Sequence, residues 1–422
     1  MQYKILFFSE ILGAGGGGIA SERIINSFKK HDIKVISISN EKSLSLKIKY
    51  FILRLYYRLQ RFFLTTSDKF NFNSFNSNIG VYNKKKIYKK IDKFKPDIIV
   101  ITWIEYLVSL ETIYELKKKY NCEVIFIAMD NHLFAGGCRY VNECENYMDK
   151  CNNCLALKKW FKSTAIKNYS YYRFYFNKIK PLFMLPSHHA KLFYKKLNLD
   201  YRFLEFDFWP IQFENLIKNN NKNKNKDIKK RIIICPIQKF NEPRKGWEYL
   251  YYSIIDYQNQ LEKEEINIHF IFIGKLENYH IRSFKNFRVS YDYYNYLSRK
   301  DLEKLYSESD FGVIPSIQEW ASISTNEMMT FGLPVINFMT GSSKNIIIEG
   351  KNGFIVNLKN VYELSNKLKT INNMDSRNMH EMKIFTKNYA EKNFKDESFE
   401  KKLISFYEYK KRHMISKRDL IV

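Results

Sequence analysis

Residues 311–356 read FGVIPSIQEWASISTNEMMTFGLPVINFMTGSSKNIIIEGKNGFIV, and this stretch decides the fold. The apolar run 311–314 predicts a buried strand, and residues 322–331 predict a helix that Gly332 closes. A second apolar run, 335–338, predicts the next strand. Strand, helix and strand in this order are typical of a parallel sheet, and ligands of open parallel sheets bind beyond the carboxyl ends of the strands.

Two acidic residues stand out in this stretch: Glu319 in the loop before the predicted helix and Glu327 on the helix itself. Free N–H groups at a helix start favour a diphosphate, whereas carboxylates on either side of it are suited to accept hydrogen bonds from hydroxyls. A nucleotide sugar has this layout, with a diphosphate between the ribose and the sugar. The pair alone is equally compatible with an acidic loop and a solvated helix residue.

The residues around this pair follow a characteristic order: Pro315-Ser316, Glu319, Glu327, Gly332-Leu333-Pro334-Val335, Gly341, Glu349-Gly350 and Asn352-Gly353-Phe354. This series resembles the donor-binding segment of retaining glycosyltransferases of family 4. It departs from the family pattern at 320–322, where Trp-Ala-Ser stands in place of the common Phe-Gly.

The resemblance implies an α/β protein of the GT-B fold, with two Rossmann-like, doubly wound parallel-sheet domains facing a cleft. It implies a glycosyltransferase of hexosyltransferase type, which moves a sugar from a nucleoside-diphosphate sugar of UDP or GDP type to an acceptor hydroxyl with retention. By the same resemblance Glu327 holds the ribose, Glu319 contacts the donor sugar, and the helix start faces the diphosphate. That helix start is formed by Ser322, Ile323 and Ser324.

The segment KFNEPRKG, residues 239–246, follows a predicted strand and precedes a predicted helix. Its cations Lys239 and Lys245 can hold a diphosphate and neutralise it as it leaves, so no metal ion is expected to be needed for catalysis. The alternative is a pair of solvated lysines in a Lys-rich chain. The segment resembles the phosphate-binding segment of family 4, where arginine is common at the position of Lys239. The family also tends to hold the base in a loop that corresponds here to Tyr296 and Leu297.

A glycine run, residues 13–18, lies between a predicted strand at 4–9 and a predicted helix at 19–30. Such a loop lets backbone approach a phosphate closely, although glycine runs also form plain turns. It is not the dinucleotide-binding fingerprint, because no suitable acid follows a second strand. The resemblance implies that Gly17 and Gly18 face the donor diphosphate and the acceptor.

Four of the six cysteines fall within one short stretch, at Cys138, Cys144, Cys151 and Cys154. Four thiols that end in a CxxC pair can build a structural zinc site, but the spacing is not that of two CxxC hooks. Free thiols or local disulfides are the alternatives.

The same stretch resembles a subset of family 4 from capsule, O-antigen and colanic-acid-type biosynthesis, which carries a Gly-Gly-Cys segment after an aspartate, here Asp130. The family usually has histidine before that aspartate, where this chain has Met129; His132 follows nearby. This departure keeps open a second interpretation, a GT-B nucleotide-binding or scaffold protein without catalysis.

Composition and patterning predict a first domain over 1–205, with a cysteine-rich insert at 136–156, a linker over 206–230 and a second domain over 231–395. The C-terminal helix, 396–422, is expected to pack back on the first domain. The linker contains the low-complexity run KNNNKNKNKDIKK, which cannot build a core.

The formal net charge is +26, from 70 Lys and Arg against 44 Asp and Glu. No nucleic-acid-binding motif is recognisable, so nucleic acid is not expected as a partner. No secretory leader and no long uncharged apolar run are evident, which predicts a cytoplasmic protein with free thiols. Residues 47–64 form a basic, aromatic-rich helix pattern that fits either an ordinary surface helix or contact with the inner membrane. The family resemblance implies that the acceptor is a glycan or lipid-linked intermediate of polysaccharide or cell-envelope biosynthesis.

Overall fold

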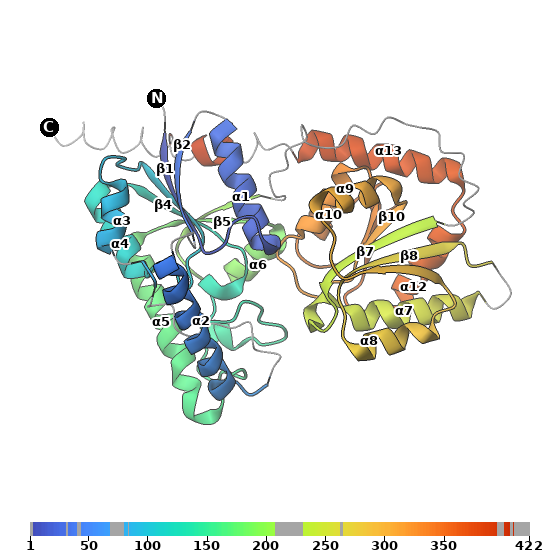
Figure 1. The fold of residues 1–422 in the computed structure, drawn as a ribbon, viewed down its shortest axis with the longest axis horizontal. Coiled ribbons are helices and arrows are strands. Elements are labelled where there is room, and N and C mark those ends of the chain that lie inside the picture. Colours follow the sequence, from blue (N-terminus) through green and yellow to red (C-terminus); the bar gives the residue numbers. More distant parts are fainter. Residues whose placement is uncertain are drawn as a thin grey trace. The chain divides into compact units, whose positions relative to one another are not determined.

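A computed structural model describes residues 3–30, 33–39, 44–67, 80–82, 84–206, 231–261, 265–394, 401–405 and 408. The chain divides into two compact units, 1–206 together with 396–422, and 207–395. Nearly all of the linker predicted at 206–230 lies outside the described residues. Each unit is an α/β structure built on one six-stranded parallel sheet (Figure 1).

The sheet of the first unit has the strand order β2-β1-β3-β4-β5-β6. Its strands are β1 (Lys4–Ser9), β2 (Lys34–Ile38), β3 (Ile98–Trp103), β4 (Glu123–Ile127), β5 (Leu182–Leu185) and β6 (Arg202–Glu205). Residues 5–8 of β1 are fully buried because helices cover both faces, which explains the continuous apolar runs of these strands. The order reverses between β1 and β3, and this reversal creates a topological switch point.

The helices of the first unit are α1 (Gly15–Lys30), α2 (Leu44–Leu64), α3 (Lys84–Ile91), α4 (Leu110–Tyr120), α5 (Lys162–Ile179) and α6 (His188–Lys196). Helix α1 buries Ala20, Ile24 and Phe28, as predicted. It begins at Gly15 rather than at residue 19, so Gly17 and Gly18 belong to its first turn and not to a loop. Single-turn 3₁₀ helices lie at Asn131–Leu133, Asn146–Asp149 and Lys159–Phe161.

The sheet of the second unit has the order β12-β11-β10-β7-β8-β9. Its strands are β7 (Arg231–Lys239), β8 (Ile268–Lys275), β9 (Ser290–Tyr294), β10 (Phe311–Ile314), β11 (Val335–Phe338) and β12 (Gly353–Val356). Successive residues of β7 enter different cores: Ile233 and Cys235 pack on one side of the sheet, and Ile234 packs on the other. This sheet also reverses its order, between β7 and β10.

The helices of the second unit are α7 (Trp247–Gln260), α8 (Asn278–Ser283), α9 (Arg299–Glu308), α10 (Ile323–Thr330), α11 (Ser343–Ile346), α12 (Val361–Asn372) and α13 (Ser376–Asn393). The strand–helix–strand unit predicted from 311–338 is β10, α10 and β11, with Ser322 as the N-cap rather than the first helical residue. Short 3₁₀ helices lie at Pro243–Lys245 and Phe284–Asn286.

The C-terminal segment belongs to the first unit in the part that is described. The Tyr3 hydroxyl donates to Glu408 Oε1 at 2.7 Å, and Lys402 Nζ donates to the Glu205 carbonyl at 3.2 Å. Residues 409–422 lie outside the described residues. Within the described part of the chain, no helix has both the length and the apolar character needed to cross a bilayer.

Candidate functional site

The switch point of the second sheet gathers the charged residues that the sequence singled out. Strands β7 and β10 are neighbours there, and the chain leaves them toward opposite edges of the sheet. Lys239 ends β7 with an exposed side chain, and Glu319 follows the carboxyl end of β10. Ligands of open α/β sheets bind at such a reversal, so this is the candidate site.

A tight turn after β7 presents two cations to Glu319. Pro243–Lys245 form a 3₁₀ turn that ends at Gly246. Lys245 Nζ lies 2.7 Å from Glu319 Oε1, and Arg244 Nη1 lies 3.0 Å from the same oxygen. Arg244 also pairs with Glu242. The sequence analysis had not singled out Arg244, and it therefore joins the site as a new member.

The electrostatics of this cluster keep Glu319 ionised. Burial alone would raise the pKa of the Glu319 carboxyl, but the charges of Lys245 and Arg244, with the hydrogen bond from Lys245, outweigh it and hold the pKa below its ordinary value. Both cations thus pair with the same carboxylate oxygen of Glu319.

Helix α10 supplies the helix start predicted for the diphosphate. The Ser322 hydroxyl caps it by accepting from the Thr325 N–H at 3.2 Å. Ile323 and Ser324 occupy the first turn, where backbone N–H groups have no acceptor within the helix, and both side chains are partly exposed.

The second acid, Glu327, is paired within the protein. Its side chain is buried, and Arg299 Nη1 lies 2.5 Å from Glu327 Oε1. Arg299 is the first residue of α9, directly after the loop with the exposed Tyr296 and the partly buried Leu297. Arg299 therefore connects Glu327, the residue expected to bind the ribose, to the loop expected to hold the base. The sequence did not reveal this connection.

Gly246 sets the geometry of this turn, which leads to a stability prediction. Its φ is +69°, and a Cβ there would lie 1.7 Å from the Pro315 carbonyl oxygen. Gly350 has a similar φ of +72° with open space around it. We expect Gly350→Ala to cost about 1–2 kcal/mol of backbone strain and Gly246→Ala clearly more, because the latter also pushes β10 away from the turn. Urea unfolding of the two variants compares the costs; equal costs would contradict the close approach.

The switch point of the first sheet holds a buried charged network that the sequence analysis missed. Glu10 follows β1 and Glu105 follows β3, and the Glu10 N–H donates to the Trp103 carbonyl at 2.9 Å. Arg139, from the cysteine-rich segment, pairs with Glu105 and lies over the Trp103 ring at 4.4 Å. The Tyr50 hydroxyl of α2 donates to Glu10.

His132 lies in the same network. Its Nε2 is 3.0 Å from Glu105 Oε1 and 2.6 Å from the Tyr172 hydroxyl. Burial lowers the pKa of His132 and raises that of Glu10, whereas Arg139 and His132 outweigh burial at Glu105 and leave its pKa below the ordinary value.

Asp130 and Gly17 border this network. Asp130 is buried, and its Oδ1 accepts from the His132 N–H at 2.8 Å. A Cβ on Gly17 would lie 2.5 Å from the Trp103 ring, so glycine there permits close packing of α1 on β3. Gly18 is buried in the same turn. Met129 Cε would lie 3.5 Å from the same Cβ, which places Met129 beside α1.

The four clustered cysteines lie near one another in the first unit. Cys151 and Cys154 are buried, and Cys138 and Cys144 are partly so. Burial, with smaller contributions from the other thiols, raises the pKa of Cys138, and burial raises that of Cys151 to about 11. Among the described residues, no three His, Cys, Asp or Glu side chains converge with the geometry of metal ligands. An ion would therefore have to draw these thiols together.

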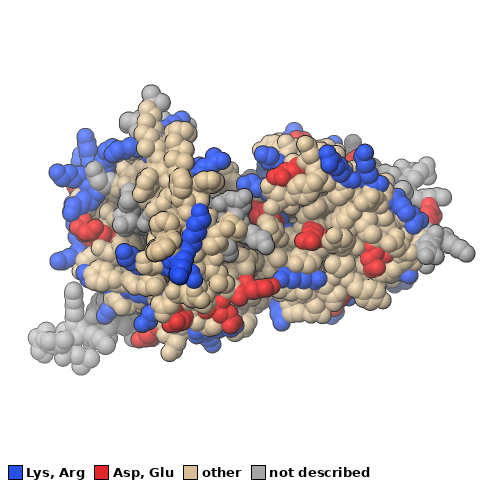
Figure 2. All heavy atoms as spheres, turned by 90° about the horizontal axis from the view of Figure 1, so that it is seen from below, with Lys and Arg blue, Asp and Glu red and all other residues tan. Residues whose placement is uncertain are grey.

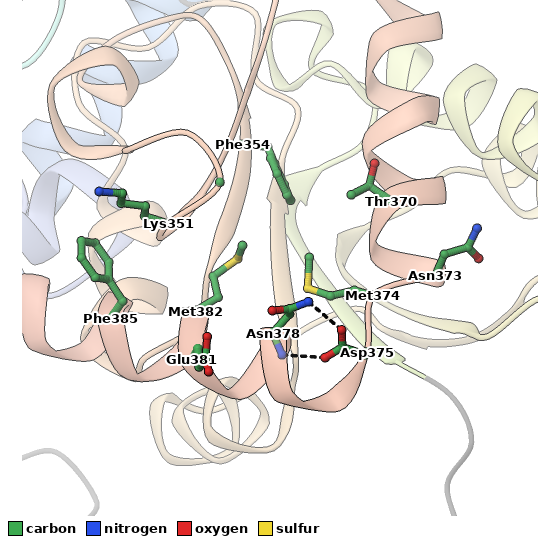
Figure 3. A pocket seen from close by; sticks show the side chains of 11 residues that line it. Lys351, Phe354, Thr370, Asn373, Met374, Asp375, Asn378, Glu381, Met382 and Phe385 are labelled. Carbon is green, nitrogen blue, oxygen red and sulfur yellow. Dashed lines mark hydrogen bonds between the residues drawn. The ribbon is translucent and has the colours of Figure 1, made fainter.

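A surface pocket of about 570 Å³ lies at the opposite end of the second sheet from the switch point (Figure 3). It is lined by Gly350, Lys351 and Phe354 around the start of β12, by Thr370, Asn373 and Met374 at the end of α12, and by Asp375, Asn378, Glu381, Met382 and Phe385 of the α13 region. This is the amino-terminal edge of the strands. The pocket is thus remote from the switch point and is not the candidate donor site.

The two α/β units with their parallel sheets define a GT-B fold. Residues 217–392, within the second unit, match the family model of glycosyl transferases group 1. No curated protein sequence matches the chain.

Solved structures support the same fold class. The chain is similar to HepE from Anabaena in complex with UDP, with 13% identity, coverage of 97% of this chain and 100% of that one, and a TM-score of 0.62. It is also similar to the sucrose-phosphate synthase from Thermosynechococcus elongatus, with 11% identity, coverage of 99% and 100%, and a TM-score of 0.62. TarM matches with 14% identity, coverage of 96% and 99%, and a TM-score of 0.63. At these identities the likeness shows the fold.

Proposed function

We propose that the protein transfers a sugar from a nucleoside-diphosphate sugar to an acceptor hydroxyl and retains the anomeric configuration. The observation that carries this proposal is the cluster of Lys245, Arg244 and Glu319 at the switch point of the second sheet, within the segment that matches the glycosyl transferases group 1 model. The HepE structures with UDP and UDP-glucose support a uridine donor as the first to test.

The proposed chemistry uses the charged residues of this cluster. The acceptor oxygen bonds to the anomeric carbon, the bond from that carbon to the diphosphate oxygen breaks with its electron pair going to the diphosphate, and the acceptor proton also goes to the diphosphate. Lys245, Arg244 and Lys239 stabilise the charge that develops there. Glu319, released from its cations, accepts hydrogen bonds from the sugar, and Glu327 accepts them from the ribose. The acceptor is proposed to be a glycan or a lipid-linked intermediate, presented at a membrane surface on the cytoplasmic side.

A second candidate function is nucleotide binding without catalysis. Met129 favours it, because this position at the end of β4 usually carries histidine in the family that the sequence resembles. In the structure the neighbouring His132 is buried and held by Glu105 and Tyr172. A glycosyltransferase should bind the donor and turn it over, whereas a nucleotide-binding protein without catalysis should bind the donor and leave it intact.

The test is thermal unfolding with UDP-, GDP- and ADP-linked sugars, together with release of the free nucleoside diphosphate. A donor at a hundred times its dissociation constant should add about 2.7 kcal/mol of stability. Glu327→Ala should weaken that shift for the preferred donor, because it removes the ribose acceptor. Stabilisation without release of diphosphate would favour the binding protein, and no shift with any donor would contradict both functions.

A structural zinc ion in the cysteine cluster is a further proposal, since four thiols are the donor set that zinc prefers. Burial raises the pKa of Cys138, Cys151 and Cys154, so zinc binding would release protons and be stronger at higher pH. We expect protein purified with zinc present to retain about one ion per chain, and Cys154→Ser to lose it. Cys122→Ser, outside the cluster, is the control. Equal metal content in the two variants would contradict the proposal.

A further inference from the structure

The outer face of α2 and the segment at 155–161, which is hydrogen-bonded to the C-terminal end of that helix, both expose apolar and basic side chains. We propose that these two segments form one docking surface for an anionic lipid membrane. The inference deepens the membrane contact proposed above by naming its surface and the lipid charge. It is tested without donor or acceptor, so its failure would leave the donor site unaffected.

The exposed apolar residues of α2 share one face of the helix. They are Ile48, Phe51, Ile52, Leu55, Tyr56, Leu59, Phe62 and Phe63, and each is at least 45% exposed. Their spacing of three and four residues places them along a single stripe over the whole length of the helix. A stripe of this size is unusual on a soluble surface and indicates an interaction site.

The opposite face of α2 accounts for the helix's attachment to the first unit. Tyr50, Tyr57 and Leu64, seven residues apart, are buried. Tyr57 packs on Tyr106 with ring centroids 4.7 Å apart, and the Tyr50 hydroxyl donates to the buried Glu10. The inner face is therefore fixed to the unit, and the outer stripe is an additional apolar face that this packing leaves uncovered.

The loop at 155–161 extends the stripe at the C-terminal end of α2. The Lys158 N–H donates to the Leu64 carbonyl at 2.9 Å, and the Thr66 N–H donates to the Ala156 carbonyl at 3.0 Å. The loop residues Leu155, Trp160 and Phe161 are all exposed, Trp160 by 87%. These backbone hydrogen bonds hold the loop at the C-terminal end of α2, the end that carries Phe62 and Phe63, whose exposures are 70% and 61%. Aromatic side chains of this kind favour the interface of a bilayer.

The charge of both segments is entirely positive. Helix α2 carries Lys47, Lys49, Arg54, Arg58 and Arg61, and residues 155–168 carry Lys158, Lys159, Lys162 and Lys167. Neither 44–64 nor 155–168 contains Asp or Glu. In the view from below (Figure 2), the uncharged surface of the first unit is bordered by Lys and Arg side chains and, along one edge, also by Asp and Glu side chains.

This combination fits a lipid surface better than the other partners. Helical spacing puts Arg54, Arg58 and Arg61 along one border of the apolar stripe, where their heads can reach lipid phosphates while the stripe enters the acyl boundary. An anionic leaflet attracts such cations electrostatically. Nucleic acid offers no apolar phase for eight side chains, and a second copy of this face would oppose the same charges.

The experiment measures sedimentation of the full-length protein with vesicles of phosphatidylcholine alone or with added phosphatidylglycerol. We expect binding to the anionic vesicles and little to the neutral ones. Phe62→Ser with Trp160→Ser should lower the partition coefficient by about tenfold or more, equivalent to about 1.4 kcal/mol. Arg58→Glu with Lys159→Glu should lower it at low salt, with a smaller effect at about 0.5 M salt, where surface charges are screened.

A control pair removes two other exposed aromatic residues, from elsewhere in the chain. Tyr252→Ser with Tyr362→Ser, in the second unit, takes away side chains that are 52% and 66% exposed and should leave vesicle binding unchanged. Equal binding to neutral vesicles, or an equal effect of the control pair, would overturn the proposal. So would a dimer in lipid-free light scattering that Phe62→Ser with Trp160→Ser dissociates, since a second copy would then be the occupant.

Discussion

Lys245→Met is expected to lower kcat/KM for sugar transfer by about 10²–10³-fold, the usual effect of removing one preorganised group from a developing negative charge. Lys245 Nζ is already positioned, 2.7 Å from Glu319 at the switch point of the sheet, so the charge needs little reorganisation during the reaction. Most of the loss should appear in kcat, because the leaving diphosphate carries more charge in the transition state than in the bound donor.

The variant should remain folded, because Arg244 stays 3.0 Å from the same Glu319 oxygen and keeps that buried carboxylate paired. Lys275→Met is the matched control: it removes an exposed lysine at the carboxyl end of the neighbouring strand β8. We expect little change in kcat/KM from the control. Lys245→Arg should recover activity only in part, since a planar guanidinium cannot occupy the position of the ammonium.

Initial rates at several donor concentrations, with circular dichroism of each variant, provide the measurement. An equal loss in Lys245→Met and Lys275→Met would mean that general surface charge, rather than this position, attracts the donor. Full activity of Lys245→Met would place the diphosphate elsewhere and overturn the assignment of the site.

The inner strands of the sheets could be predicted from sequence because they are buried on both faces, whereas the edge strands β6 and β9 are only partly buried and were not predicted. Apolar runs such as 311–314 and 335–338 therefore mark strands without any knowledge of their neighbours. The start of α1 was harder to place. Glycine is a poor helix former, and only the tight fit of Gly17 against Trp103 explains why the helix includes the glycine run.

The partners of the candidate site could not be predicted, for a different reason. In a chain with 70 Lys and Arg residues, Arg244 and Arg299 carry no distinguishing local signal. Glu327 and Arg299 are 28 residues apart. They meet because α9 and α10, the helices before and after β10, bring them together in the fold. Glu10 was not singled out from the sequence. Its position directly after a strand was the signal that could have identified it.

Arg139→Met is expected to destabilise the first unit by about 3–5 kcal/mol, because it leaves a buried carboxylate without its main partner. The Glu105 side chain is 1% exposed, and Arg139 supplies its closest cation. Arg139→Met with Glu105→Gln should recover part of the loss, since the double variant contains no unpaired charge at this position. Arg202→Met, which removes a more exposed ion pair with Glu123 in the same unit, should cost little.

The pH dependence distinguishes lost charge pairing from lost packing. In the native protein the pKa of Glu105 is below its unfolded value, so its contribution to stability is present at neutral pH and is lost as pH falls through that lowered pKa. Without Arg139, burial dominates and raises the Glu105 pKa. Above that pKa, where the carboxyl is ionised, the variant is destabilised. This loss of stability disappears as pH falls and the carboxyl becomes protonated.

The difference in unfolding free energy between the native protein and Arg139→Met should therefore shrink between neutral pH and the unfolded pKa of glutamate. Urea unfolding across this range, followed by tryptophan fluorescence and circular dichroism together, measures it, since two units can unfold in separate transitions. A pH-independent difference would show instead that Arg139 stabilises the unit mainly through its contact with the Trp103 ring. In that case the charge pairing at the first switch point would contribute little to the stability of the unit.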